Sequence, residues 1–511
     1  MSLYVQLALL AGAIGVYLYL KFRSLSQYFP SRGIPFVKPL WPIGSDVKGI
    51  LMMEHIAHSL QNVYYKLAPH SIGGYFIGIT PIVMVRNPEF VQRIYTTDFS
   101  YFMDRGFDID EKTNPLDAHI FLLSGAKWRY VRSKLSPIFT SGKLKWMFSG
   151  MNKCVQSLTS HLDKTISFGK DVDMKEDASG LTTEVISSCA FGIEAQSIGN
   201  PDGRFRVFAK KAIEGNLIKN FVRNVSPRLF TLLKMRSLPI EVEKFIMDLV
   251  AQSFNHRLTT GYTRNDFIQL LLQLREKGSV EFEDLDEEDE REKNSLTHHE
   301  QDKNVIELND NILGAQLFVF LVAGYETTAS TIYHLFYLFS KYPECQDKAR
   351  EEVKKALAKH GDYTYQMVSE LPYLSNCIDE TLRLFPPLVI NFRVCNKDYT
   401  FPDGTTIEKG TKIVLPTYAI HHDPSNFPNP EEFRPERFEQ SIAKGSYAPF
   451  GDGPRVCIGK RFALVEIKLT FARLLMSYLI KPSDRGNEVK FNPKSFLLQV
   501  KDGLLVKLEK L

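Results

Sequence analysis

A ten-residue segment at 450–459, FGDGPRVCIG, constrains the fold of this chain more than any other feature. Its glycines and its proline hold Cys457 on a tight turn, directly before a helical pattern at 458–479. The cysteine is therefore expected at a helix N-terminus beside the cation Arg455, and both features favour a thiolate over a thiol. Backbone N–H groups in such a loop can point at the sulfur and tune its electron donation to a metal. We expect Cys457 to be a metal ligand; the alternative is a buried structural cysteine.

The remaining cysteines, the missing motifs and the charge balance exclude several other classes of protein. The five further cysteines form no CxxC pair and no compact framework, which is typical of a reducing compartment. The chain has no HExxH and no GxSxG motif, so neither a zincin nor an α/β-hydrolase is indicated. The 63 basic and 59 acidic residues leave a net charge of +4, which is too small to indicate a nucleic-acid partner.

The N-terminal segment is apolar. Residues 3–20 carry no charge, and a helix of that length rises roughly 27 Å, close to the roughly 30 Å of a bilayer's hydrocarbon core. Lys21 and Arg23 follow at once, and by the positive-inside rule they hold the downstream chain on the cytosolic side. We therefore predict a transmembrane signal anchor at 1–22. The alternative is a cleaved signal peptide, which the small residues at 11–13 favour but the basic stop and the missing basic leader do not.

Behind the anchor, the sequence predicts one mainly α domain with a small β portion. The prolines of 23–43 indicate a stiff, extended linker that cannot be helix, and the domain itself spans 44–511. The acidic run at 281–292 is predicted to be a solvated loop between helices. Helical periodicity covers 126–166, 240–277, 309–341, 344–359 and 458–479, and short strand signals lie at 72–85, 405–416 and 496–509.

Two further motifs precede the cysteine loop. Glu380 and Arg383 are three residues apart, so on a helix they share a face and can form an ion pair. PERF follows at 435–438. In this order, and together with the FxxGxRxCxG pattern, the motifs resemble those of the cytochromes P450, in which the arginine of the PERF segment, here Arg437, completes a Glu-Arg-Arg network. The resemblance covers essentially the whole chain, anchor included. It is closest to the microsomal enzymes of the insect xenobiotic-metabolising group and their vertebrate drug-metabolising relatives.

The resemblance implies the cytochrome P450 fold and a haem cofactor (heme b). In the family, the cysteine of this loop is the axial iron ligand, a role that would fall to Cys457. Phe450, Gly453 and Gly459 match the family's loop pattern, and the resemblance implies that they contact the haem. The chain departs from the family at Val456, which replaces a polar residue often found before the cysteine, and in the strong charge of its acidic run.

A second family signature lies within the helical pattern at 309–341. Ala323-Gly-Tyr-Glu326-Thr327-Thr matches the oxygen-binding segment of the family, in which a small residue such as Ala323 lets the haem approach the helix. The resemblance implies that Thr327 orders a water near the bound oxygen and that Glu326 relays protons. The alternative is a threonine that bonds back to its own helix beside a solvated glutamate.

The haem carboxylates need cations or other hydrogen-bond donors. Trp128 and Arg132 lie four residues apart on one predicted helix, as in the family's WxxxR motif, so both can reach the same carboxylate. Arg455 would serve the other side. Arg393 is a further candidate, for which a surface position is the alternative.

The chain has no GxGxxG motif and no sign of a flavin module, so its electrons must come from a separate protein. The resemblance implies the NADPH-dependent P450 reductase, with cytochrome b5 as a second candidate donor. Lys127 and Lys134 share a helix face turned away from Trp128, and Lys460 and Arg461 follow the cysteine. We expect these four cations to form a basic docking surface on the thiolate side.

These features predict a monooxygenase in the endoplasmic reticulum membrane, with its catalytic domain on the cytoplasmic face and a small lipophilic substrate. Two alternatives remain: a haem-thiolate protein that binds or senses without turnover, and an oxygen-independent isomerase or dehydratase. The substrate pocket is expected to be apolar. Its expected walls are the 101–123 loop, the 205–240 region, Phe318, Val322, Leu388–Ile390 and Phe496–Leu498.

Overall fold

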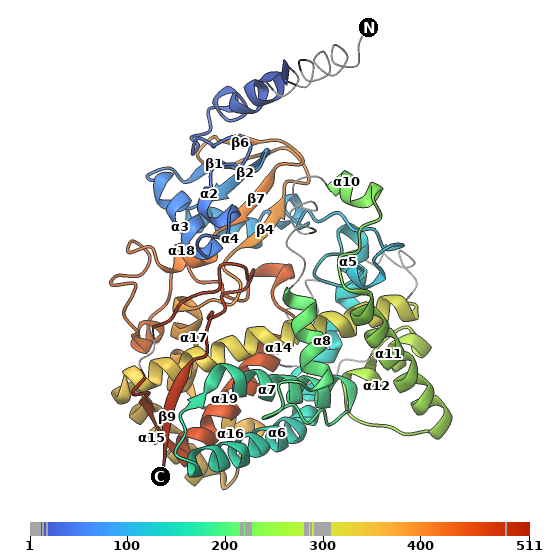
Figure 1. Cartoon of the computed structure of the whole chain (residues 1–511), viewed down its shortest axis with the longest axis vertical. Coiled ribbons are helices and arrows are strands. Elements are labelled where there is room, and N and C mark those ends of the chain that lie inside the picture. Colours follow the sequence, from blue (N-terminus) through green and yellow to red (C-terminus); the bar gives the residue numbers. More distant parts are fainter. Residues whose placement is uncertain are drawn as a thin grey trace.

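The protein is mainly helical, with a small β portion, as the sequence predicts. In the computed structural model the helices fill most of the molecule, and a four-stranded sheet lies at the end nearest the N-terminal helix (Figure 1). The structure describes residues 19–214, 227–280, 308–485 and 488–511 together with the single positions 12, 15, 16, 219, 286, 289 and 290.

The helices follow one another along the chain with short connections. They are α2 (Val47–Ile50), α3 (Ile56–Lys66), α4 (Pro88–Tyr95), α5 (Gly125–Leu135), α6 (Ser141–Ser167), α7 (Met174–Ile186), α8 (Arg204–Glu214), α10 (Pro227–Leu232), α11 (Ile240–Thr260), α12 (Phe267–Lys277), α14 (Asp310–Lys341), α15 (Pro343–His360), α16 (Tyr365–Ser369), α17 (Pro372–Leu384), α18 (Thr417–His421) and α19 (Lys460–Ser477).

The strands form three small sheets. In the largest, the strand order is β1-β2-β7-β4, with β2 and β7 parallel and the other pairs antiparallel. A second sheet joins β3, β9 and β8 near the C-terminus, and β5 pairs with β6. The strands are β1 (Ile72–Ile77), β2 (Thr80–Val85), β3 (Val172–Asp173), β4 (Asn391–Val394), β5 (Tyr399–Thr400), β6 (Thr406–Ile407), β7 (Lys412–Leu415), β8 (Tyr478–Pro482) and β9 (Leu505–Lys510).

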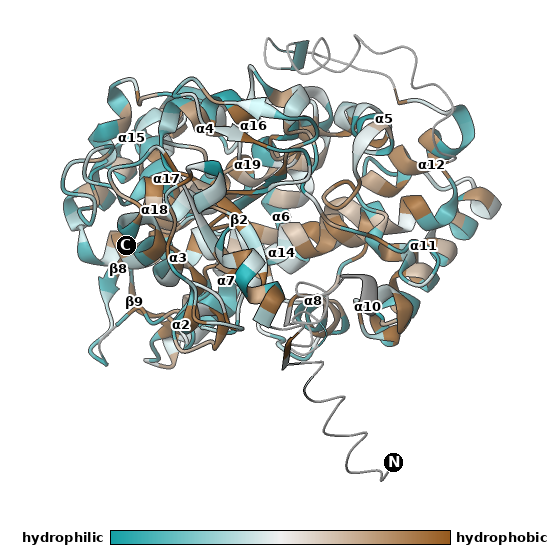
Figure 2. Cartoon of the chain, turned by 90° about the horizontal axis from the view of Figure 1, so that it is seen from above, coloured by the Kyte–Doolittle hydropathy of each residue, from teal (hydrophilic) through white to brown (hydrophobic). Residues whose placement is uncertain are grey.

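The long helix α14 runs through the centre of the molecule and packs most extensively against α7 (Figure 1). Asn309 caps its N-terminus by accepting a hydrogen bond from the Ile312 N–H, and the helix ends before Pro343, which cannot continue it. The residues of central helix α14 are mostly hydrophobic, whereas those of the peripheral helix α15 are largely hydrophilic (Figure 2). The core therefore forms around the helix that carries the predicted oxygen-binding segment.

The predicted membrane anchor at 1–22 lies largely outside the described residues. Residues 19–26 are helical and project away from the body (Figure 1). Within the described part of the chain, one helix is long and apolar enough to cross a membrane; it is α14, and most of it is buried inside the protein. Its apolar character is therefore explained by the core.

Two of the predicted long helices are each divided in two. The pattern at 126–166 breaks where Pro137 begins a short 3₁₀ turn between α5 and α6, because proline lacks the N–H that a continuous helix needs. The pattern at 240–277 breaks at Gly261, whose φ of 67° closes α11 in the left-handed region before Asp266 caps α12. Apolar periodicity continued across both breaks and hid them.

The proline-rich segment at 23–43 differs from the predicted extended spacer. Residues Pro30–Arg32 form a 3₁₀ turn, and Phe29 beside them is fully buried. Further along, the Val37 N–H donates to the Gly74 carbonyl oxygen of β1 at 2.9 Å. The segment is therefore packed onto the sheet edge, because its aromatic residues bury more surface there than a free linker would.

The strand signals and the acidic run also need adjustment. The signal at 72–85 forms the hairpin of β1 and β2, but at 496–509 only the second half becomes a strand, β9. Most of the acidic run at 281–292 lies outside the described residues. Of its described members, Asp289 is not solvated: it is buried and forms an ion pair with Arg461.

Candidate active site

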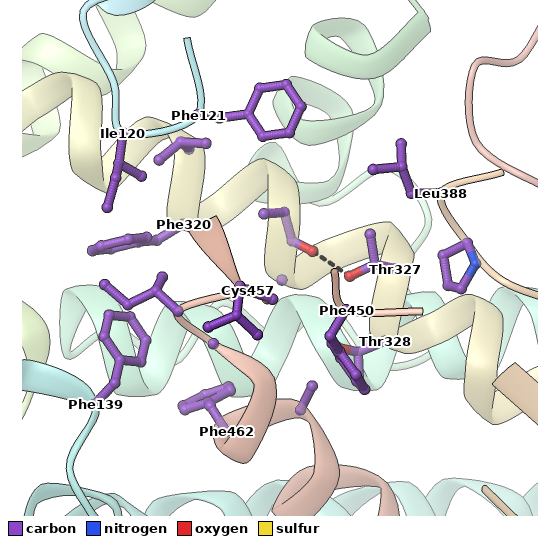
Figure 3. A pocket seen from close by; sticks show the side chains of 18 of the residues that line it. Ile120, Phe121, Phe139, Phe320, Thr327, Thr328, Leu388, Phe450, Cys457 and Phe462 are labelled. Atoms are coloured by element: carbon purple, nitrogen blue, oxygen red, sulfur yellow. Dashed lines mark hydrogen bonds between the residues drawn. The ribbon is translucent and has the colours of Figure 1, made fainter. Parts of the chain in front are cut away.

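A large cavity lies where α14 faces the cysteine loop. It encloses about 1370 Å³ of space between atoms, its opening to solvent included. Residues from both predicted segments line it, among them Ala323, Thr327, Phe450 and Cys457 (Figure 3). Its lining joins segments that are far apart in the sequence, so the two predicted motifs meet at one cavity.

The cysteine loop is folded by short-range backbone contacts. The Cys457 N–H donates to the Phe450 carbonyl oxygen at 2.9 Å, and the Val456 N–H donates to the Gly453 carbonyl oxygen at 3.0 Å. Gly453 has a φ of 66°, and a Cβ there would overlap the carbonyl oxygen of Tyr95. Gly453 does not line the cavity; it lets the loop approach α4 closely and so positions the cysteine.

Cys457 is the cysteine that lines the cavity, and the other five are buried elsewhere. Burial raises the pKa of its thiol, and the Gly459 N–H and the guanidinium of Arg132 only partly offset this. The thiolate stays a prediction: the Gly459 N–H and the nearby cations favour it, and desolvation acts against it. A metal ion bound at the sulfur would reverse this balance.

Helix α5 brings Trp128 and Arg132 to one wall of the cavity, as their four-residue spacing predicts. Both residues are buried, and an Arg132 guanidinium N–H donates to the Val456 carbonyl oxygen at 2.8 Å. Arg455 also lines the cavity, with its guanidinium stacked 3.9 Å from the centre of the Trp128 ring. Most of its donors are used by the chain itself: it donates to the carbonyl oxygens of Met103, Ile120 and Leu123.

A fourth arginine was not predicted. Arg105 lines the cavity, and its Nε is buried without a hydrogen-bond partner in the described part of the chain. Burial, together with repulsion from Arg393 and Arg132, lowers the pKa of Arg105 to about 9. Arg393 is fully buried on β4, which excludes the surface position considered for it, but it does not line the cavity. The sequence placed Arg105 in the 101–123 loop without any periodic pattern that could give its direction.

This cationic wall fits a cofactor with two carboxylates. Three arginines, Arg105, Arg132 and Arg455, line the cavity, and Asp104 lies 3.6 Å from Arg455. A buried surplus of positive charge is costly unless an anion joins it. The residues therefore suit a haem: a sulfur for the iron, apolar walls for the ring and cations for the propionates.

On the opposite wall, α14 presents Ala323, Gly324 and Thr327 to the cavity. A Cβ at Gly324 would lie 3.1 Å from Cδ1 of Ile186, which also lines the cavity, so the wall is close-packed here. The Thr327 hydroxyl donates to the Ala323 carbonyl oxygen at 2.6 Å (Figure 3). This is the bond back to its own helix that the sequence left open as an alternative.

Glu326 does not line the cavity. It is 3% exposed, and its Oε1 has no hydrogen-bond partner in the described part of the chain. Burial raises the pKa of its carboxyl to about 7, although a hydrogen bond with Gln499 acts in the opposite direction. The solvated glutamate considered as an alternative is therefore excluded.

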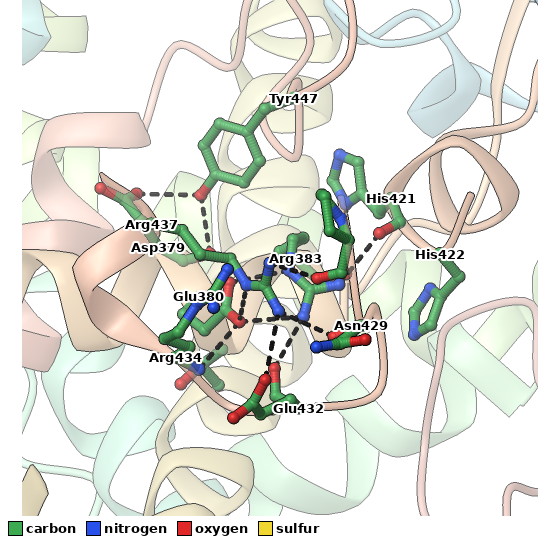
Figure 4. A network of polar contacts seen from close by, with 12 residues as sticks. Asp379, Glu380, Arg383, His421, His422, Asn429, Glu432, Arg434, Arg437 and Tyr447 are labelled. Carbon is green, nitrogen blue, oxygen red and sulfur yellow. Dashed lines mark hydrogen bonds and ion pairs between the residues drawn. The ribbon is translucent and has the colours of Figure 1, made fainter. Parts of the chain in front are cut away.

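On α17, Glu380 accepts the hydrogen bonds that hold the predicted network together (Figure 4). Arg383 donates to both carboxylate oxygens of Glu380, at 2.7 and 2.9 Å, and Arg437 donates to one of them at 3.1 Å. The two Nη nitrogens of Arg437 donate to the carbonyl oxygens of Pro428 and Asn429. The network thus ties α17 to the segment that leads into the cysteine loop.

The apolar walls agree only in part with the predicted pocket. Ile120 and Phe121 of the 101–123 loop line the cavity together with Leu388 (Figure 3). Phe318 and Val322 do not line it, because their helical phase places them on the side of α14 that faces away from the cavity. Val319 and Phe320 line it instead. Val389, Ile390, Phe496–Leu498 and the described residues of 205–240 also lie outside its wall.

Comparison with known proteins shows similarity along almost the whole chain. A family model described as Cytochrome P450 matches residues 35–507. "Probable cytochrome P450 6a14" of Drosophila melanogaster is 33% identical, and the match covers 99% of this chain and 99% of that protein. "Cytochrome P450 6k1" of Blattella germanica is 32% identical over 96% of this chain and 94% of the relative. "Cytochrome P450 6A1" of Musca domestica is 33% identical over 94% and 93%.

Proposed function

Because this chain belongs to the cytochrome P450 family and is a haem monooxygenase of that family, we propose that it inserts one atom of O₂ into a small lipophilic substrate with electrons that come from NADPH through a separate reductase. One observation carries this proposal. Cys457 and the Ala323–Thr327 segment line one cavity, although they are more than 120 residues apart in the sequence.

In this proposal Cys457 is the axial ligand of the haem iron. When bound, the haem supplies the activation of O₂, and a thiolate ligand donates the electron density that favours cleavage of the O–O bond. Arg105, Arg132 and Trp128 bind the carboxylates, because all three line the cavity and carry N–H donors. Arg455 has a different role: it holds three carbonyl oxygens of the 101–123 loop and adds positive charge. Phe450, Ala323 and Gly459 also line the cavity and would contact the ring.

Thr327 is proposed to hold a water for proton delivery at the cavity wall. Its hydroxyl donates to the Ala323 carbonyl oxygen, so its own oxygen remains able to accept a hydrogen bond from a water in the cavity. Glu326, with a pKa of about 7, can both hold and release a proton near neutral pH. Since this carboxyl is turned away from the cavity, its proton must reach Thr327 through water or a change of rotamer.

The substrate class follows from the walls. Ile120, Phe121, Phe320 and Leu388 surround the cavity with aliphatic and aromatic carbon (Figure 3). Such walls favour a small lipophilic compound, because they offer few hydrogen bonds to a polar one. The proposal covers a xenobiotic as well as an endogenous compound of this class.

We place the protein at the endoplasmic reticulum membrane, with residues 1–22 as the anchor, 23–43 as the connection and 44–511 as the catalytic domain on the cytosolic side. The charge-free stretch at 3–20 and the basic residues Lys21 and Arg23 support this placement. The electron donor is proposed to be the NADPH–cytochrome P450 reductase, with cytochrome b5 as a second donor.

The test is a coupled assay on the purified, haem-loaded protein. With the reductase, NADPH consumption, O₂ consumption and hydroxylated product should rise together for an accepted lipophilic substrate, and a spectral binding screen would identify such a substrate. Cys457→Ser should abolish the absorption band of the reduced, carbon monoxide-bound thiolate haem. Persistence of that band in the variant would overturn the ligand proposal, and a band without turnover on any substrate that binds would favour a sensing protein.

A further inference from the structure

Arg461 lies on α19, four residues after Cys457, and is held by two acids from a distant part of the chain. One guanidinium nitrogen is 2.7 Å from Oδ1 of Asp286, and the other forms an ion pair with Asp289. Ser141, at the start of α6, joins them: its hydroxyl donates to Asp286 at 2.7 Å and its N–H donates to Asp289 at 3.3 Å. Three separate segments therefore meet at this one cation.

The contacts are partly sheltered from solvent. The side chains of Asp289 and Arg461 are 6% and 18% exposed, whereas that of Asp286 is 49% exposed. Burial raises the pKa of Asp286, but hydrogen bonds from the Asp289 N–H and from Ser141, with the charge of Arg461, outweigh it and hold that pKa below its ordinary value. At least one full negative charge thus faces Arg461 at neutral pH.

Asp286 and Asp289 lie between α12 and α14, and a residue at the start of that same segment contacts a second cation of the expected docking surface. The Lys134 ammonium donates to the carbonyl oxygen of Gly278, immediately after α12, at 2.6 Å. Lys127, a third cation of that surface, is paired with Glu111 at 2.8 Å. The basic surface that an acidic partner would contact is therefore already engaged by carboxylate and carbonyl oxygens of this chain.

We propose that Asp286 and Asp289 act as an internal competitor, which occupies Arg461 and must be displaced by the acidic surface of a redox partner. The inference rests on the proposed function, since it takes the thiolate side as the docking surface. A carboxylate pair of this chain and a carboxylate pair of the partner need the same guanidinium, and Arg461 presents one planar group with two edges. The competitor lowers partner affinity and reduces the net number of ion pairs formed on docking.

The experiment titrates the haem-loaded protein with purified NADPH–cytochrome P450 reductase and measures the reductase concentration that gives half-maximal turnover. In the Asp286→Asn/Asp289→Asn variant this concentration should fall about threefold, the size of effect that partly exposed ion pairs have on an equilibrium. Its dependence on salt should become steeper, because docking then forms ion pairs without breaking internal ones. Equal half-saturation and equal salt dependence in variant and parent would overturn the proposal.

Glu290→Gln is the matched control for Asp289→Asn. Glu290 is the next residue, is exposed, and forms no ion pair with a described residue, so the two variants change the charge equally at one place. Glu290→Gln should leave half-saturation unchanged. An equal effect of the two single variants would mean that overall charge, and not the contact with Arg461, governs docking. The carbon monoxide band of each variant verifies an intact haem site, and Asp286→Asn alone serves if Asp289→Asn folds poorly.

Arg461→Gln separates this inference from the proposed function. If the docking surface is correct, Arg461→Gln raises the half-saturating reductase concentration, and Asp286→Asn/Asp289→Asn has no further effect in that background. If Arg461→Gln raises the half-saturating reductase concentration but Asp286→Asn/Asp289→Asn matches the parent, only the internal competitor is refuted. If Arg461→Gln changes nothing, docking occurs elsewhere and both ideas fail, while turnover itself still supports the monooxygenase.

Discussion

Two groups of buried arginines in this protein differ in how their charge is balanced. In the first group, Glu380 accepts hydrogen bonds from both Arg383 and Arg437, and all three side chains are almost fully buried. Along the cavity wall, Arg105 has a buried Nε without a hydrogen-bond partner in the described part of the chain, and Arg132 and Arg455 line the same space. The chain supplies the carboxylate of the first group, whereas in the second group Arg105 keeps a buried N–H that no described residue accepts.

The difference distinguishes a scaffold from a binding wall. A buried ion pair whose remaining donors reach carbonyl oxygens needs nothing from outside, so it fixes the chain before the cysteine loop. A buried cationic surplus is unfavourable until an anion arrives, as the lowered pKa of Arg105 indicates. Charge balance therefore locates the anionic end of the cofactor independently of the cysteine.

The largest effect is expected at the balanced group. Glu380→Gln removes the buried carboxylate that Arg383 and Arg437 share, and leaves only the half-exposed Glu432, 4.0 Å from Arg437. It should lower the free energy of unfolding by about 3–5 kcal/mol. Urea unfolding, with haem incorporation as a second readout, measures this. The control is Glu408→Gln, because Glu408 pairs with Arg32 with 59% of its side chain exposed and should cost no more than about 1 kcal/mol. Similar losses in the two variants would contradict the assigned role of the network.

Glu326 is a buried acid without a cationic partner at hydrogen-bond distance, and it should respond to pH. Burial raises its folded pKa to about 7 from an ordinary value of 4.5, so the folded state holds a proton that the unfolded state releases. Stability from this group is full below pH 4.5 and is lost as the pH rises through 7. Glu326→Gln should therefore be more stable than the parent by up to about 3 kcal/mol at pH 8, and no more stable at pH 4.

Unfolding curves measured across this pH range test the assignment. A constant difference between Glu326→Gln and the parent from pH 4 to pH 8 would mean that the carboxyl stays ionised in the fold. Asp484→Asn is a suitable control, since this exposed acid should leave the pH dependence unchanged.

The cavity wall should give effects of opposite sign with and without haem. Arg105→Gln removes one donor for a carboxylate, so the haem should dissociate about tenfold faster, measured by transfer to a haem-scavenging protein. The haem-free variant should be at least as stable as the parent, because repulsion with Arg132 and Arg393 is relieved. Arg93→Gln is the control, because Arg93 pairs with Asp98 away from the cavity. It should change the rate of haem dissociation much less than Arg105→Gln does, and it should not stabilise the haem-free protein. If haem-free Arg105→Gln were less stable than the parent, repulsion between Arg105 and its neighbouring arginines would not be a significant cost in the haem-free protein.

The sequence predicted the Glu380 network better than the arginines of the cavity wall, because the network depends on the local spacing of residues along a helix. Glu380 and Arg383 meet because residues three apart share a helix face, and Trp128 and Arg132 reach one wall for the same reason. Arg105 lies in a loop, where no repeat gives the direction of a side chain. The pairing of Asp289 with Arg461, across more than 170 residues, had no local signal either.

Where the sequence prediction failed, a rule of helix geometry had been available but a competing pattern hid it. The phase of α14 already sets Phe318 on the opposite side of the helix from Ala323 and Thr327, although the resemblance placed all three at the cavity. Pro137 marked the break between α5 and α6, but apolar periodicity continued across it. Family motifs identify the chemistry of a segment, and helical phase decides which of its residues reach the site.

The smallest effect on stability, and the most specific effect on chemistry, is expected at Thr327. Its hydroxyl bonds to the Ala323 carbonyl oxygen of its own turn, a contact that contributes little to a helix. Thr327→Ala should therefore change the free energy of unfolding by no more than about 0.5 kcal/mol. If this hydroxyl orders water for proton delivery, product formed per NADPH should fall severalfold while hydrogen peroxide release rises. Thr327→Ser should restore coupling, since it keeps the hydroxyl. Tight coupling in Thr327→Ala would limit Thr327 to a packing role and leave the cationic wall and Cys457 as the functional part of the cavity.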